Sequence, residues 1–230
     1  MSRISAITPT DYDGGVIGNE RLTALAGGIL LVLILIELLS VVSLRALMSI
    51  HVAVGVALAL PLTVKLASTG YRFVRYYAGS AGYVKRGPPS LPLRLLAPIL
   101  VAITLILMAS GIGLVAVGPT SPGPLLALHN VSALVWLPLI AIHTVAYVLG
   151  VPRIAAPDLM TAARIPGRTL RLAASLGSLA LGALGALVLL PAAAPWVSWS
   201  QATHQVPAPL LVGAFLSIVA LAAVRPLRWR

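Results

Sequence analysis

Long apolar runs alternate along the chain with short polar, basic or proline-rich segments. Six of these runs approach the length of about 20 residues that a helix needs to cross the hydrocarbon layer of a membrane. They cover about 22–44, 47–69, 94–118, 125–149, 169–190 and 208–224. The pattern predicts an all-α integral membrane protein with six transmembrane helices, of which the fifth is rich in Gly and Ala and the sixth is short.

The composition supports a membrane location, because the chain is 59% hydrophobic and 9% charged, with a mean hydropathy of +1.02. Nearly all of its 16 Lys and Arg lie in segments on one side of the six runs, while Arg45 lies alone on the other side. The positive-inside rule therefore predicts a multi-pass protein of the plasma (inner) membrane with both termini in the cytoplasm. The charge is divided among membrane loops, which favours contact with anionic lipid and argues against a nucleic-acid partner.

The runs also predict how the chain is organised. We expect a cytoplasmic tail (1–21), a four-helix core (22–149), a basic cytoplasmic linker (150–168) and a two-helix addition (169–230). The tail has no apolar segment typical of a cleavable signal peptide, and its acidic residues suit a solvated segment or docking on a basic loop. The aromatic and basic stretch from Gly70 is predicted to extend the second helix along the interface, and Trp196 and Trp199 suit an aromatic belt.

Cysteine is absent, which excludes disulfides, thiolate-bound iron–sulfur clusters and c-type haem attachment. Two residue pairs within the apolar runs share one spacing: His51 and Lys65 are 14 residues apart, as are His129 and His143. Fourteen helical residues rise about 21 Å in close to four turns, so both members of a pair face the same way. The second and fourth runs cross the membrane in the same direction, which predicts that His51 pairs with His129 and Lys65 with His143.

Polar residues at such depth usually mark function. A single His can simply hydrogen-bond a neighbouring helix, but three His on a two-level grid favour axial ligation of haem iron between facing helices. On these residues the chain resembles the membrane cytochromes b, including the haem-bearing anchor subunits of formate dehydrogenases and nickel–iron hydrogenases. His129 and His143 match that family's two ligands on the fourth helix, and His51 matches the outer ligand of the second helix.

The resemblance covers the first four runs and implies two stacked haems b, one held by His51 and His129 and the other by His143. It also implies electron transfer between quinone and a partner redox subunit of molybdenum, hydrogenase or iron–sulfur type. The chain would then be an electron-transfer subunit of an oxidoreductase complex rather than a stand-alone enzyme. The family's remaining ligand is also a His, and this chain departs from it with Lys65.

Lys65 has three interpretations. It ligates the inner haem as a neutral amine, it snorkels to the cytoplasmic surface, or it pairs with a haem propionate. Arg45 on the outer side, and Arg72 and Arg75 on the inner side, are candidates for neutralising propionates or for contacting lipid.

Glu37, in the first run, suits either a proton-linked quinone site or a hydrogen bond to a neighbouring helix. Two alternative functions stay open at this point. One keeps only the outer haem. The other is a haem-free anchor or small transporter with a proton path through Glu37, Lys65 and His143.

Overall fold

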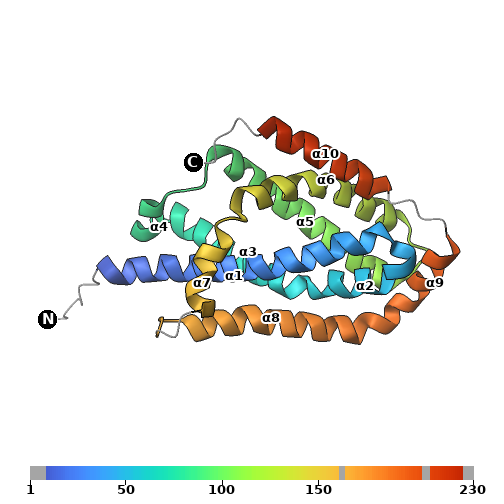
Figure 1. Ribbon diagram of the computed structural model, residues 1–230, viewed down its shortest axis with the longest axis horizontal. Coiled ribbons are helices and arrows are strands. Elements are labelled where there is room, and N and C mark those ends of the chain that lie inside the picture. Colours follow the sequence, from blue (N-terminus) through green and yellow to red (C-terminus); the bar gives the residue numbers. More distant parts are fainter. Residues whose placement is uncertain (1–8, 161–163, 204–207, 225–230) are drawn as a thin grey trace.

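The computed structural model describes residues 9–160, 164–203 and 208–224, and these are helical with no strand (Figure 1). Parts of the predicted cytoplasmic tail, linker and two-helix addition (1–8, 161–163, 204–207 and 225–230) lie outside the described residues. The helices are α1 (Pro9–Val42), α2 (Leu44–Ala57), α3 (Ala59–Tyr77), α4 (Ala81–Arg86), α5 (Leu91–Val117), α6 (Pro124–Tyr147), α7 (Val151–Met160), α8 (Arg168–Leu189), η1 (Leu190–Ala193), α9 (Ala194–Ala202) and α10 (Ala208–Val224).

Five helical segments in the described part of the chain are long and apolar enough to cross a membrane. They are Gly14–Val42, Leu44–Tyr77, Leu91–Val117, Pro124–Tyr147 and Arg168–Ala202. The sixth predicted run forms α10, whose apolar part, Leu210–Ala223, is shorter than the other five. Large apolar side chains such as Leu35, Leu187 and Phe215 are more than half exposed. Outward-facing apolar surface of this kind is what a lipid solvent requires.

The helices pack in two groups, seen in Figure 1. In the first group α1, the continuous α2–α3 segment and α8 contact one another. In the second group α6 packs between α5 and α10. Small buried clusters join elements near the two ends of the bundle, with Leu25 and Ala155 at one end and Met48, Leu114 and Trp196 at the other. The middle of the bundle, between the two groups, has far fewer direct helix contacts.

A proline explains the break between α2 and α3. Pro61 has no backbone N–H, so it cannot donate to the carbonyl of Ala57 four residues earlier. That carbonyl lies against α8, and a Cβ atom added to Gly182 would collide with it. The missing side chain of Gly182 therefore lets two backbones approach closely at the break, which is a common use of glycine in membrane helices.

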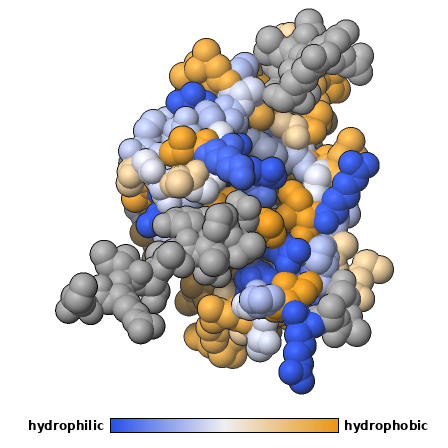
Figure 2. Space-filling model, turned by 90° about the vertical axis from the view of Figure 1, so that its left-hand side faces the viewer, coloured by the Kyte–Doolittle hydropathy of each residue, from blue (hydrophilic) through white to orange (hydrophobic). Residues whose placement is uncertain are grey.

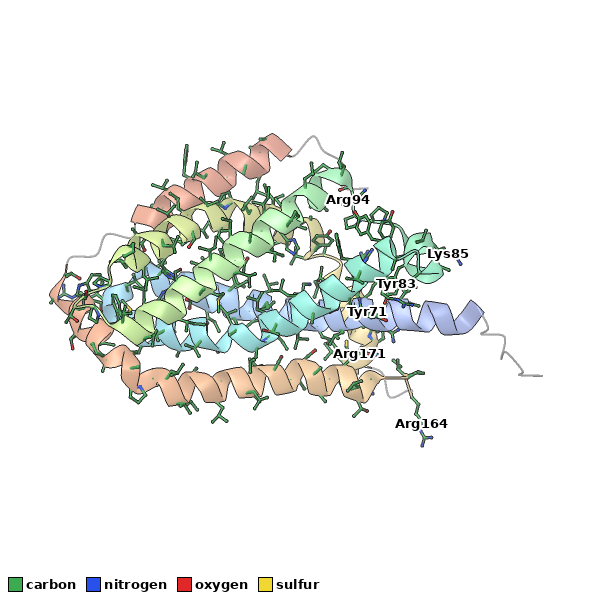
Figure 3. All side chains as sticks on the ribbon, turned by 180° about the vertical axis from the view of Figure 1, so that it is seen from behind. Tyr71, Tyr83, Lys85, Arg94, Arg164 and Arg171 are labelled. Atoms are coloured by element: carbon green, nitrogen blue, oxygen red, sulfur yellow. The ribbon has the colours of Figure 1, made fainter. Side chains whose placement is uncertain are left out.

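Basic residues gather at the end of the bundle where α1 begins, and we call this the basic end. Figure 3 shows Lys85, Arg94, Arg164 and Arg171 there, coming from different parts of the chain, and Figure 2 shows hydrophilic side chains interspersed with apolar ones on this face. The aromatic stretch from Gly70 continues α3 to Tyr77, as the sequence predicted.

Helices occupy much of the predicted N-terminal tail and of the predicted linker. Helix α1 begins at Pro9, well before the predicted span, and its Glu20 accepts hydrogen bonds from Arg86 at 2.7 and 3.1 Å. Glu20 thus docks on the basic end, and no solvated tail separates it from the first span. Within the predicted linker, α7 packs on α1, where its fully buried Asp158 lies 3.7 Å from Arg21. Asp158 also binds Arg171 of α8 through both carboxylate oxygens at 2.6 and 2.8 Å.

The segment after α8 also differs from the sequence prediction. It forms η1 and α9, which cover the ends of α2 and α5 at the pole opposite the basic end. Trp196 is 4% exposed, and its indole nitrogen donates to the Leu114 carbonyl at 2.9 Å. Trp196 is therefore a packing residue that ties α9 to α5, because the Leu114 carbonyl, which also accepts the Gly118 N–H, has a second lone pair for the indole N–H.

The close contact between α8 and α2 predicts that two glycines of α8 differ in the effect of substitution on stability. Gly182→Ala should destabilise the fold by about 1–3 kcal/mol, because the new methyl group meets backbone that cannot move aside. Gly177→Ala, with open space at its Cβ position, should be neutral or stabilise the helix by about 0.5–1 kcal/mol. Thermal unfolding in detergent measures both, and equal effects of the two substitutions would contradict the packing.

The buried ion pair predicts a loss of stability in Asp158→Asn of about 3–5 kcal/mol, because Arg171 is left without its counter-charge. The hydrogen bond from Arg171 holds the pKa of Asp158 below its ordinary value. The pair therefore stabilises the fold above pH ~4, and that contribution is lost as the pH falls through the lowered pKa. Denaturant unfolding of the variant and of the exposed control Arg164→Gln at pH 7 checks this, and indistinguishable stabilities would refute it.

Candidate functional site

His51 and His129 lie together, as their predicted pairing requires. His51 is in the middle of α2 and His129 near the start of α6, and both are half-buried. Their ring centres are 6.2 Å apart and their planes are inclined by 78°. This is the one close approach of imidazoles among the described residues, and it spans the space between the two helix groups.

The partners of His51 fix which of its nitrogens carries hydrogen. Its Nδ1 lies 2.9 Å from Glu37 Oε1 and 3.3 Å from Ser40 Oγ, both on α1. The single hydrogen of Ser40 is already donated to the Glu37 carbonyl at 2.6 Å, so its oxygen can only accept from His51. Both neighbours are acceptors, which places the hydrogen of a neutral ring on Nδ1 and leaves a lone pair on Nε2.

His129 repeats this arrangement with α5. Its Nδ1 lies 3.2 Å from the Leu107 carbonyl and 3.2 Å from Ser110 Oγ. Ser110 in turn donates its hydrogen to the same Leu107 carbonyl at 3.0 Å. The hydrogen of His129 therefore also belongs on Nδ1. A Cβ atom at Gly111 would lie 3.0 Å from the His129 ring, so the glycine makes room for the imidazole.

The pair has the dimensions of bis-imidazole ligation of one iron. A metal–imidazole bond is about 2.0–2.1 Å, and the ring centre lies roughly 1.1 Å beyond the bonded nitrogen, so two axial imidazoles have centres about 6.3 Å apart. The same separation also suits two rings packed edge to face. In the described residues no group of three or more His, Asp or Glu is arranged to hold a metal ion by itself. A haem needs only two axial ligands from the protein.

The second predicted pair, Lys65 and His143, is arranged differently. Lys65 Nζ donates to the Thr23 carbonyl on α1 at 2.9 Å, and a Cβ atom at Gly27 would lie 2.9 Å from that nitrogen. The side chain therefore turns into the bundle, and the snorkelling interpretation is wrong. His143 on α6 stacks near Tyr147, with ring centres 5.0 Å apart. In the described residues no hydrogen bond joins His143 to Lys65, so the predicted second pair is not in direct contact.

A polar seam between α1 and α3 continues from Lys65 toward the basic end. Thr23 and Ser68 hydrogen-bond each other through their hydroxyl groups. Asn19 donates to the Ser68 carbonyl at 3.1 Å and accepts from its hydroxyl at 3.1 Å. Individual Ser, Thr and Asn residues in an apolar run give no signal by themselves, so the sequence did not reveal this seam. Which of these residues face one another depends on how α1 and α3 are aligned along their length.

In the described residues the site histidines make no hydrogen bond with any of the three candidate arginines, Arg45, Arg72 and Arg75. Arg45 is exposed at the turn between α1 and α2, near the outer pair in depth. Arg72 donates to the Gly87 carbonyl at 3.2 Å and to Glu20 at 3.5 Å, while Arg75 lies over the ring of Tyr71. Arg72 and Arg75 are thus held mainly by neighbours at the basic end.

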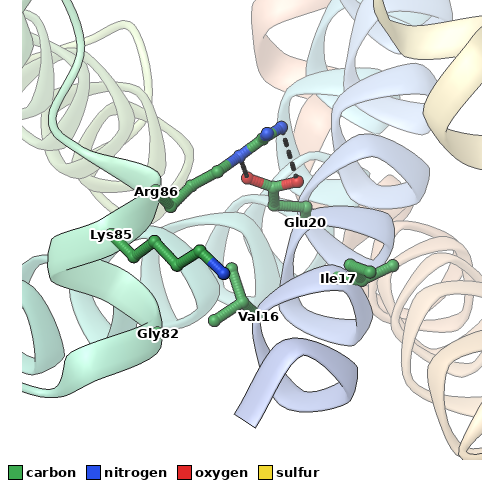
Figure 4. A pocket seen from close by; sticks show the side chains of 6 residues that line it. All are labelled: Val16, Ile17, Glu20, Gly82, Lys85 and Arg86. Atoms are coloured by element: carbon green, nitrogen blue, oxygen red, sulfur yellow. Dashed lines mark hydrogen bonds and ion pairs between the residues drawn. The ribbon is translucent and has the colours of Figure 1, made fainter. Parts of the chain in front are cut away.

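A surface pocket of about 350 Å³ opens at the basic end between α1 and α4 (Figure 4). Its charged groups largely satisfy one another, because Arg86 and Glu20 pair across it. The pocket lies far from the two histidine levels and offers them no ligand. It is lined by Val16, Ile17, Glu20, Gly82, Lys85 and Arg86.

Comparison of the chain with protein-family models, curated proteins and solved structures gave no match. The assignment of a function therefore depends on the residues and their geometry.

Because the chain contains only two lysines, the inward position of Lys65 can be tested by chemical labelling. A water-soluble acylating reagent should modify the exposed Lys85 and spare Lys65, whose nitrogen is held at the Thr23 carbonyl. Mass spectrometry of protein labelled in native membranes measures both sites at once. Equal labelling of the two lysines would show that Lys65 reaches the surface.

Proposed function

We propose that this chain is an integral membrane b-type cytochrome that relays electrons across the bilayer. The observation that carries the proposal is the pair His51 and His129: their ring centres are 6.2 Å apart and both Nδ1 atoms face acceptors. Membrane helices rarely carry such residues without a functional partner. Two neutral imidazoles with free Nε2 lone pairs on facing helices are a donor set that suits haem iron.

In this proposal His51 and His129 hold the outer haem. When bound, the haem supplies a reversible one-electron couple. The protein's part is to present the two Nε2 lone pairs, to keep the rings from turning through their Nδ1 hydrogen bonds, and to surround the site with apolar side chains. Arg45, at a similar depth, is the cation available for an outer propionate.

A second haem would be held at the inner level by His143 and Lys65, about 21 Å from the outer one by helix rise. A neutral amine has two hydrogens and one lone pair, so Lys65 can donate to Thr23 and still offer a lone pair to iron. Arg72 and Arg75 are the nearest candidates for its propionates.

The contact between Lys65 and Thr23 equally favours a second candidate, in which the chain carries the outer haem alone. There Lys65 fastens α3 to α1 and has no iron to bind. The number of haems in the protein separates the two candidates.

The proposed setting is the plasma (inner) membrane, with the basic end in the cytoplasm as the positive-inside rule requires. The proposed redox partners are quinone and a separate subunit of molybdenum, hydrogenase or iron–sulfur type. These partners come from the family resemblance, and the chain itself would act as an electron-transfer subunit.

Difference spectra of the purified protein test the proposal. Reduction should produce the α-band of haem b, and the pyridine haemochrome should count two haems. His51→Ala and His129→Ala should each remove the same one of them, and His143→Ala should remove only the other. His204→Ala is the matched control, because His204 is the one remaining histidine, and it should keep both haems.

Folded wild-type protein with no b-type spectrum would overturn the haem proposal altogether. One haem per chain, unchanged by His143→Ala and Lys65→Met, would instead establish the single-haem candidate.

A further inference from the structure

Glu37 has a buried carboxylate oxygen that the proposed function leaves unexplained. Its Oε1 accepts from His51 Nδ1 at 2.9 Å, while its Oε2 is buried without a hydrogen-bond partner. A buried carboxylate oxygen without a partner costs free energy, so such an atom in a folded protein calls for an explanation. Gly55 on α2 lies beside the carboxylate, and a Cβ atom there would be 3.4 Å from Oε1, an ordinary van der Waals distance.

A comparison of the two histidine-bearing hairpins isolates what is special about Glu37. In each hairpin a serine on the first helix accepts from the histidine on the second and donates to the carbonyl three residues before it. That preceding residue is Glu37 in the α1–α2 hairpin and Leu107 in the α5–α6 hairpin. His129 accordingly has a neutral carbonyl as its main acceptor, whereas His51 has a carboxylate side chain.

We infer that Glu37 is a positioning residue that holds His51 for the outer iron and lowers the reduction potential of that site. This inference rests on the proposed function. A carboxylate that accepts from Nδ1–H orients the imidazole and makes its Nε2 a stronger donor. A stronger donor, together with the nearby negative charge, stabilises ferric over ferrous iron, and second-shell hydrogen bonding is one of the means by which proteins set haem potentials.

The same contact explains why an acid is placed in an apolar run. A hydrogen bond between helices needs only a hydroxyl or an amide, and Ser40 already provides one beside His51. The carboxylate of Glu37 adds a negative charge beside the His51 ring, and helix packing does not require that charge. The outer iron is therefore made harder to reduce than it would be with two ligands of the His129 kind.

A redox titration of the haem-loaded protein tests the inference. Glu37→Gln keeps an acceptor for Nδ1 without the charge, and Glu37→Leu copies the residue found in the other hairpin. Both should keep the outer haem and shift its midpoint potential to more positive values, with the larger shift in Glu37→Leu. Ser110→Ala is the matched control, because His129 keeps the Leu107 carbonyl, and it should shift the potential much less.

An unchanged outer potential in both Glu37 variants would overturn the inference and leave the haem proposal standing. If Glu37→Gln folds without the outer haem, Glu37→Asp must restore it, and failure of this rescue also overturns the inference.

Nitrogen NMR of histidine-labelled, haem-free protein tests the contact separately. His51 should be the Nδ1–H tautomer in the wild type and should change its nitrogen shifts in Glu37→Leu. If the wild type binds no haem, the proposed function fails while this tautomer measurement still decides whether Glu37 holds His51. An unperturbed His51 spectrum in Glu37→Leu would refute the positioning role.

Discussion

The arrangement of the site depends on the hydrogen bonds that fasten each histidine ring to the preceding helix. The Nδ1 atom of His51 faces acceptors on α1, and that of His129 faces acceptors on α5. In an apolar surrounding an imidazole N–H must find an acceptor, so these contacts fix the orientation of both rings. They also fix the tautomer, and they leave Nε2 of each ring as the atom available for chemistry. Each of these bonds joins the two helices of one hairpin.

The level of His51 and His129 differs from the level of Lys65 and His143 in its hydrogen bonds. At the outer level two imidazoles approach each other and each is supported by a serine and a carbonyl or carboxylate. At the inner level Lys65 is drawn toward α1 by the Thr23 carbonyl, at the head of a polar seam that includes Asn19 and Ser68. The outer level thus has a symmetrical pair of ligand donors, while the inner level has one imidazole, His143, facing an amine that is already bound on one side.

Hydrophobic run lengths and a fixed helical repeat were enough to predict the long helices and the approach of His51 to His129. Both follow from the rise and rotation per residue, which do not depend on neighbours. The roles of Glu37, Lys65 and Trp196 could not be derived in this way. Each depends on which backbone carbonyl or side chain of another helix lies opposite, and that is decided by tertiary packing. The helical form of residues 9–21 and of α7 was missed for a related reason, since polar side chains in these segments are bound by Arg86 and Arg171 from distant parts of the chain.

The most direct measurement of the central claim is the electron paramagnetic resonance spectrum of the oxidised protein. Two imidazoles with planes inclined by 78° should give low-spin ferric haem with the very anisotropic signal of nearly perpendicular axial ligands. That signal should vanish in both His51→Ala and His129→Ala. Absence of this very anisotropic signal from the haem-loaded wild type, or its survival in either substitution, would contradict axial ligation by this pair.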